Sequence, residues 1–145
     1  MQTKPPTNKG ISTGIVIVVL LLLIHILVDV LNNGNSRADF FLWFIQVLLY
    51  FFGGLIAASS QFIAQHDLPD PTEGIANASR GSALIVFAVM WCYFVIRSIA
   101  IDDAGMFAGM GLVFSIFFGM ADLVIALVLG SISGSIIRKK NELYQ

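Results

Sequence analysis

Four ionisable residues and one glutamine stand out within the long apolar stretches of this 145-residue chain, because ionisable groups there are costly and therefore informative. At membrane depth a carboxylate, imidazole or guanidinium group can form an ion pair, bind an ion or relay a proton. What each one does depends on the element that carries it and on the depth at which it lies. The five residues are His25, Asp29, Gln46, Arg97 and Asp122.

Asp122 is the most informative of the five, because it lies near the middle of its apolar stretch, far from both ends. Small residues recur around it at three- or four-residue steps and would form one stripe on a helix: Gly111, Ser115, Gly119, Ala126, Gly130 and Gly134. Small stripes let helix backbones approach closely in lipid, so we expect Asp122 to face protein. A second small patch that could receive this stripe contains Gly53, Gly54, Ala57 and Ala58.

Three roles remain open for Asp122. It could be protonated and donate a structural hydrogen bond to a neighbouring helix. It could pair with a basic or polar group of another subunit, because no Lys, Arg or His of this chain is expected at its depth. It could also relay protons or bind a cation.

The other four polar residues are expected to meet near one end of the apolar stretches. His25 and Asp29 are four residues apart and share a helix face, and Arg97 and Gln46 lie toward the same end of their own stretches. In this hypothesis Arg97 pairs with Asp29, and His25 or Gln46 completes the hydrogen bonds. The simpler alternative places Asp29 among lipid headgroups, with Arg97 extended outward to water.

Sequence patterns of common catalytic and nucleotide-binding sites are absent from the chain. It contains no GxxxxGK[ST], HExxH or GxSxG motif. Its two histidines, His25 and His66, are expected on opposite sides of a membrane, and the single Cys92 has no partner for a disulfide. The net charge of −1 gives no reason to expect nucleic-acid binding. We therefore expect neither enzyme activity nor a cofactor or metal.

The elements that carry these residues are long apolar blocks. Hydrophobic residues make up 57% of the chain and charged residues 12%, whereas a soluble domain usually has about 25% charged residues. A membrane-spanning helix needs about 20 mostly apolar residues. The pattern predicts an all-α membrane protein with a single domain over 1–145. It has about four transmembrane helices, over 11–31, 40–62, 83–101 and 106–137, with one substantial loop over 64–82.

The basic residues predict how these spans are oriented. Arg37 alone falls on one side of the four spans, and the other Lys and Arg residues outside them fall on the opposite side. Since basic loops favour the cytoplasm, we expect both termini and the 64–82 loop to be cytoplasmic, in a bacterial inner membrane. The residues on that side are Lys4, Lys9, Arg80, Arg138, Lys139 and Lys140.

These features favour a non-catalytic accessory or structural subunit of a larger membrane complex for energy conversion, secretion or transport. The reasons are the small size, the missing catalytic motifs, the packing stripe, and a buried acid without a partner inside the chain. Its expected partners are membrane lipids and either other membrane subunits or further copies of itself. One alternative is a small oligomeric transporter or ion- or proton-conducting protein that uses Asp122. Another is a membrane immunity or regulatory protein.

Overall fold

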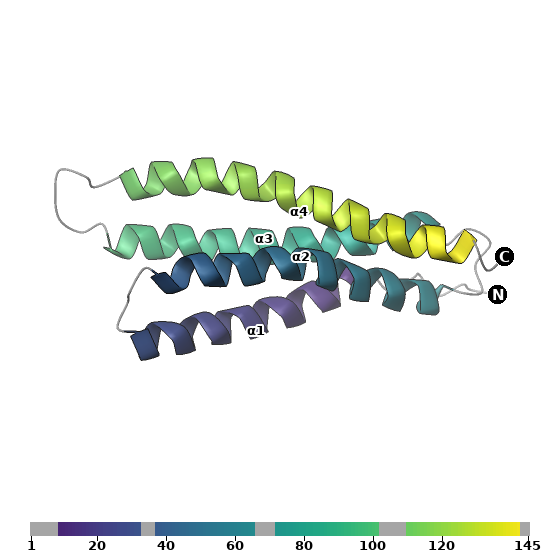
Figure 1. Cartoon of the computed structure of the whole chain (residues 1–145), viewed down its shortest axis with the longest axis horizontal. Coiled ribbons are helices and arrows are strands. Elements are labelled where there is room, and N and C mark those ends of the chain that lie inside the picture. The colour runs from purple at the N-terminus through teal and green to yellow at the C-terminus, as the bar shows by residue number, and fades with distance from the viewer. Residues whose placement is uncertain (1–8, 33–36, 66–71, 102–109, 143–145) are drawn as a thin grey trace, which may run out of the picture.

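The computed structural model describes residues 9–32, 37–65, 72–101 and 110–142, and these residues form four α-helices (Figure 1). Each helix contains a stretch that is long and apolar enough to cross a membrane. The predicted all-helical architecture is confirmed, and the four apolar helices indicate a multi-pass integral membrane protein. The helices are α1 (Lys9–Asn32), α2 (Arg37–Ala64), α3 (Thr72–Ile101) and α4 (Met110–Glu142).

The four helices pack around a central pair. Both α2 and α3 contact all the other helices, whereas the described residues of α1 and α4 do not contact each other. In Figure 1, α1 and α4 lie on opposite sides of α2 and α3. Successive helices alternate in direction, so the first residues of α1 and the last residues of α4 lie at the same end of the bundle.

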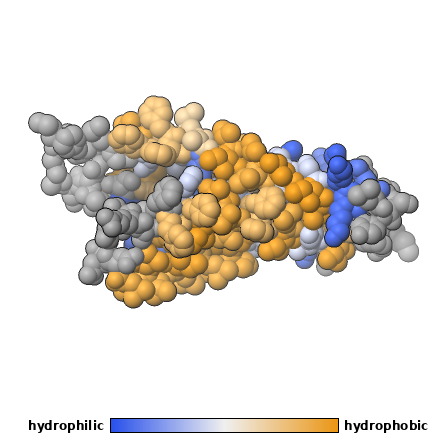
Figure 2. Space-filling view, viewed as in Figure 1, coloured by the Kyte–Doolittle hydropathy of each residue, from blue (hydrophilic) through white to orange (hydrophobic). Residues whose placement is uncertain are grey.

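Most of the visible surface is hydrophobic. Figure 2 shows a broad apolar area over the middle of the bundle, with a hydrophilic band near the end that carries the start of α1 and the end of α4. The spanning stretch of α4 is the least buried of the four. Its exposed side chains include Phe114, Phe117 and Phe118. Such a surface suits lipid or another membrane helix, since large apolar patches are rare on soluble monomers.

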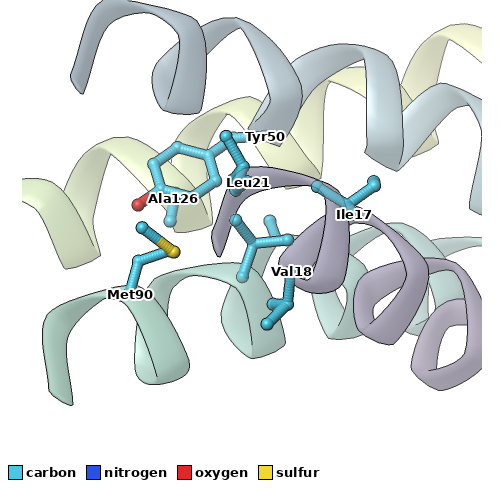
Figure 3. Packing of buried hydrophobic residues seen from close by; sticks show 8 residues of the cluster. Ile17, Val18, Leu21, Tyr50, Met90 and Ala126 are labelled. Atoms are coloured by element: carbon cyan, nitrogen blue, oxygen red, sulfur yellow. The ribbon is translucent and has the colours of Figure 1, made fainter. Parts of the chain in front are cut away.

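The hydrophobic core draws on all four helices (Figure 3). The small Ala83 of α3 and Ala126 of α4 are almost completely buried, and they let the backbones of these helices approach each other. The core residues are Ile17, Val18, Leu21, Tyr50, Ala83, Val86, Met90 and Ala126.

The predicted loop over 64–82 is wrong for its second half, because α3 begins at Thr72 rather than near Ala83. The small and polar residues of this segment have low hydropathy, yet the neighbouring helices cover one face of it. Ala78 and Ser79 are buried, and the backbone of Ala78 lies against Gly10 of α1, where a side chain would not fit. Packing therefore extends the helix beyond the limit that hydropathy predicts.

The fourth helix also differs from its predicted range of 106–137. Residues 106–109 lie outside the described residues, and the helix continues to Glu142. Arg138 Nε lies 3.5 Å from Glu142 Oε1, one helical turn later. Lys139 and Lys140 occupy the last turn, where cations interact favourably with the helix dipole. The first two helices extend their predicted ranges by only one to three residues at each end.

Candidate functional site

The Asp122 carboxyl group is buried between α4 and α2, with 9% of the residue exposed. Its Oδ2 accepts hydrogen bonds from Tyr50 Oη at 2.7 Å and from Gln46 Nε2 at 3.1 Å. Gln46 Nε2 also donates to Tyr50 Oη at 2.5 Å. Trp43, one turn earlier in α2, also hydrogen-bonds to the carboxyl group. These four residues form the Asp122 cluster.

Helical periodicity and equal depth bring the Asp122 cluster together. Trp43, Gln46 and Tyr50 follow each other at steps of three and four residues, so they share one face of α2. Tyr50 lies nine residues after the start of its spanning stretch at Phe41, and Asp122 lies nine residues after Val113. Because α2 and α4 run in the same direction, both side chains lie about 14 Å into the span, by the helical rise of about 1.5 Å per residue.

Two expectations about this site are wrong. A buried acid without a partner inside the chain was expected at Asp122, but α2 supplies polar partners for it. Gln46 was expected to join Asp29 and Arg97, but its amide instead bonds to Asp122 and Tyr50. Those partners are neutral, so none of them compensates the charge of an ionised Asp122.

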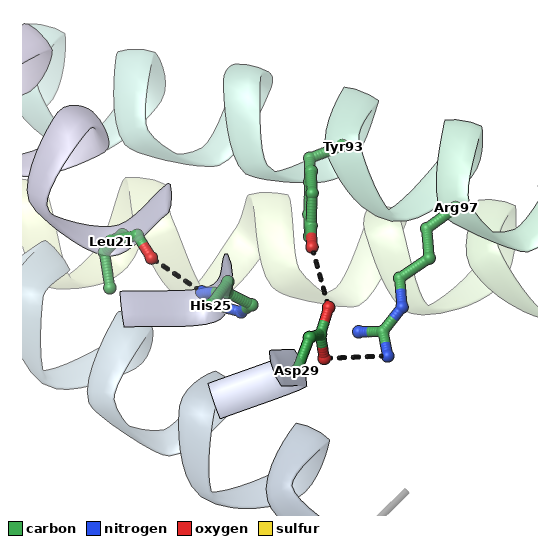
Figure 4. Close-up of polar contacts among 5 residues, drawn as sticks. All are labelled: Leu21, His25, Asp29, Tyr93 and Arg97. Atoms are coloured by element: carbon green, nitrogen blue, oxygen red, sulfur yellow. Dashed lines mark hydrogen bonds and ion pairs between the residues drawn. The ribbon is translucent and has the colours of Figure 1, made fainter. Parts of the chain in front are cut away.

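A second group of polar residues, the Asp29 cluster, joins α1 to α3 (Figure 4). Arg97 Nη2 lies 3.1 Å from Asp29 Oδ1, with side chains 19% and 31% exposed. Tyr93 Oη donates to Asp29 Oδ2 at 3.3 Å. The predicted Arg97–Asp29 ion pair is therefore present, in a partly exposed position where both charges are compensated.

His25 lies beside the Asp29 cluster but makes no hydrogen bond to it. Its Nδ1 lies 2.9 Å from the carbonyl oxygen of Leu21, one turn earlier in α1, and the residue is fully buried (Figure 4). The ring packs edge-on against Tyr93 and Phe94, at centroid distances of 5.6 and 5.5 Å. The expectation that His25 completes the hydrogen bonds of the Arg97–Asp29 pair is wrong.

The small-residue stripe of α4 packs along α3. The indole of Trp91 lies against Gly119, where an added Cβ would overlap it, and Trp91 Nε1 donates to the Ser115 carbonyl oxygen at 3.1 Å. Ala126 is buried in the core, and a Cβ at Gly130 or Gly134 would lie close to α3. Gly111 lies in the second position of α4.

A third group, the serine cluster, was not predicted as a polar site. Ser79 Oγ of α3 donates to the Gly130 carbonyl oxygen of α4 at 2.5 Å and shares a 2.6 Å hydrogen bond with Ser133 Oγ. A Cβ at Gly54 of α2 would overlap the hydroxyls of both serines. The patch around Gly54 was predicted as a possible receiver of the α4 stripe, but it contacts Ser133 of α4 instead, and the stripe glycines lie against α3.

Among the described residues, no group of three or more His, Cys, Asp or Glu side chains is placed to hold a metal ion. His66 lies outside the described ranges, and Cys92 is exposed. No protein-family model matches the chain, and comparisons with curated proteins and with solved structures gave no match. The three clusters and the surface around them are therefore the features that bear on function.

Proposed function

We propose that this protein is a non-catalytic structural or accessory subunit of a larger membrane complex. One observation carries the proposal. The polar side chains of all three clusters join helices of the bundle to one another. The Asp122 cluster links α2 to α4, the Asp29 cluster links α1 to α3, and the serine cluster links α3 to α4 beside α2. Polar contacts of this kind stabilise helix association in lipid, where hydrophobic exclusion between helices is weak.

The exposed face of α4 supports the same proposal and indicates where a neighbouring subunit would bind. One side of α4 is fixed by its small stripe and by Asp122, while Phe114, Phe117 and Phe118 are more than half exposed on the remaining surface. Aromatic side chains provide large contact areas in interfaces. In this proposal the complex lies in a bacterial inner membrane, and both termini of the chain are cytoplasmic.

Photo-crosslinking in the native membrane tests the subunit proposal. A photoreactive amino acid replaces Phe117, which is 68% exposed on α4, or, as a matched control, Leu27, which is 58% exposed on α1. After gentle detergent extraction, we expect the Phe117 position to give a discrete adduct with a different membrane protein, and the Leu27 position to give mainly lipid adducts. Recovery of monomers or homo-oligomers alone would contradict the proposal. Stoichiometric capture of one partner, without a larger complex, would favour a regulatory protein instead.

The proposed orientation has its own test. Reporter domains that are active only in the cytoplasm are fused to the N-terminus or the C-terminus of the chain. Activity of both fusions is expected. Inactive fusions at both ends, together with activity of reporters that require export, would reverse the orientation.

One observation favours a second candidate, a small ion- or proton-conducting protein. Asp122 is a buried acid whose partners are neutral, and intramembrane acids often lie on ion or proton pathways. In that case Asp122→Asn abolishes flux in proteoliposomes while assembly persists, and Asp29→Asn, in the partly exposed ion pair, leaves the flux in place. If the protein is a structural subunit, Asp122→Asn loosens assembly and there is no flux to lose.

A further inference from the structure

The side-chain carbonyl oxygen of Gln46 is buried without a hydrogen-bond partner. Gln46 is 1% exposed, and its Oε1 is inaccessible to solvent. The amide nitrogen of the same side chain bonds to both Asp122 and Tyr50, which holds the amide group inside the Asp122 cluster. A buried carbonyl without a donor is unfavourable by about 1–3 kcal/mol, so this oxygen indicates that a further partner belongs to the cluster.

The carboxyl group of Asp122 indicates the charge of that partner. Tyr50 Oη and Gln46 Nε2 both donate to Asp122 Oδ2, and donors of this kind stabilise an ionised carboxylate. Its partners in the described part of the chain are neutral side chains. An ionised group in an apolar interior is strongly unfavourable unless an opposite charge compensates it. The missing partner should therefore carry one positive charge.

We propose that Asp122, Gln46 and Tyr50 form a binding site for one small monovalent cation of the sodium type. The ligand atoms are a carboxylate oxygen of Asp122, Oε1 of Gln46 and the phenolic oxygen of Tyr50, which suit a hard cation that prefers oxygen. Ca²⁺ binds about six to eight oxygens, and Mg²⁺ requires near-octahedral coordination that retains several waters. A site with one carboxylate and two neutral oxygens compensates the charge of a monovalent cation better than that of a divalent one.

This site is independent of the two functions considered above. A cation that remains bound would hold α2 against α4 in a structural subunit, and a cation that exchanges would serve a conducting protein. Binding can therefore be measured whether or not the protein catalyses flux and whether or not it has a partner.

The first test compares the purified full-length protein in NaCl and in choline chloride at equal ionic strength. Choline is too large for a site formed by three side chains of two packed helices. Because a ligand that binds only the folded state stabilises it by mass action, we expect the midpoint of thermal unfolding to rise with the logarithm of the Na⁺ concentration and to stay constant in choline. Equal midpoints in the two salts, or a stabilisation that follows pH alone, would overturn the proposal.

A pair of matched variants locates the site. Gln46→Leu removes the unpaired oxygen, whereas Gln61→Leu changes the same residue type on α2, where Gln61 Oε1 accepts a hydrogen bond from the Lys9 backbone nitrogen instead. We expect at least a tenfold loss of Na⁺ affinity for Gln46→Leu and an unchanged affinity for Gln61→Leu. Equal effects of the two substitutions would contradict the assignment.

Trp43 provides a second readout that does not require unfolding. In a Trp91→Phe background it is the only tryptophan of the chain, and it hydrogen-bonds to the Asp122 carboxyl group. A saturable change in its fluorescence is expected on titration with NaCl and is lost in Asp122→Asn. If Asp122→Asn does not fold, Tyr50→Phe replaces it and should weaken the response. A response that is the same in the variant tested and in its parent would refute the site.

Discussion

Two aspartates of this bundle have opposite surroundings. Asp29 pairs with Arg97 in a position where its side chain is 31% exposed, whereas Asp122 is 9% exposed and is bound by Tyr50, Gln46 and Trp43. The more exposed carboxylate thus has the charged partner, and the buried carboxyl group has neutral ones.

The presence of an ion pair does not by itself mean that a contact stabilises the bundle strongly. A partly exposed ion pair contributes about 0–1 kcal/mol, because solvent screens both charges. A hydrogen bond to a charged group in a buried position contributes about 1.5–3 kcal/mol. We therefore expect the Asp122 cluster to stabilise the bundle more than the Asp29 cluster, and three pairs of variants test this ranking.

Charge reversal should separate the two clusters most strongly. Asp122→Lys places an ammonium group against the donors of Tyr50 and Gln46, and we expect the free energy of unfolding to fall by about 3–5 kcal/mol. Asp29→Lys faces Arg97 near water and should reduce it by about 1 kcal/mol. Reversible unfolding in mixed micelles, followed by circular dichroism, measures both. Equal losses would contradict the ranking.

Removing one hydroxyl from each cluster gives a smaller difference. Tyr50→Phe removes a 2.7 Å hydrogen bond to the buried Asp122, and we expect a loss of about 1–2 kcal/mol, as for interhelical hydrogen bonds in model membrane peptides. Tyr93→Phe removes a 3.3 Å bond to the partly exposed Asp29 and keeps the ring packing on His25, so a loss of about 0.5 kcal/mol is expected. The same unfolding assay measures both losses. A larger loss for Tyr93→Phe than for Tyr50→Phe would contradict the expected ranking of the two clusters.

The salt dependence of the ion pair is a further test. Arg97→Gln should reduce the free energy of unfolding by less than about 1 kcal/mol, and the loss should shrink in 1 M choline chloride, because salt screens partly exposed charges. The loss caused by Tyr50→Phe should not depend on choline chloride. Unfolding curves at low and high salt measure the loss caused by each substitution. An Arg97→Gln effect that is independent of salt would show that the pair is more shielded from water than its exposure indicates.

A small effect is expected for His25→Phe. His25 packs beside the Asp29 cluster and is buried as Asp122 is. It is fully buried and its Nε2 has no hydrogen-bond partner. His25→Phe should therefore change the free energy of unfolding by less than about 1 kcal/mol, because removal of an unpaired nitrogen offsets the larger ring. His25→Ala is the control, with an expected loss of about 2 kcal/mol or more from the cavity. Severe destabilisation by His25→Phe would indicate a hydrogen bond of Nε2 in the native membrane.

Hydropathy predicts the apolar parts of the helices well and misses helix ends whose buried residues are small or polar. The first two helices lie within three residues of their predicted limits. The start of α3 was missed because Ala78 and Ser79 are small or polar, and their burial comes from Gly10 of α1 and Gly130 of α4. Contacts of this kind join residues that are far apart in the chain, and a hydropathy window does not detect them.

The clusters were predictable in part. Opposite charges at matching ends of two spans predicted the ion pair of Arg97 and Asp29 as one of two alternatives. The partner of Asp122 was missed since Tyr50 belongs to an apolar aromatic run, although its spacing from Trp43 and Gln46 carries the signal. His25 forms a hydrogen bond with the backbone of its own helix. The types of side chain on the other helices do not predict a contact of this kind.

The partners in the Asp29 and Asp122 clusters come from opposite halves of the chain. Arg97 follows Asp29 by 68 residues, and Asp122 follows Tyr50 by 72. Until the second hairpin is made, Asp29 therefore lacks its partners from α3, and Gln46 and Tyr50 have only each other within α2. An unfinished or truncated chain consequently leaves polar groups without their interhelical partners, which is unfavourable in lipid.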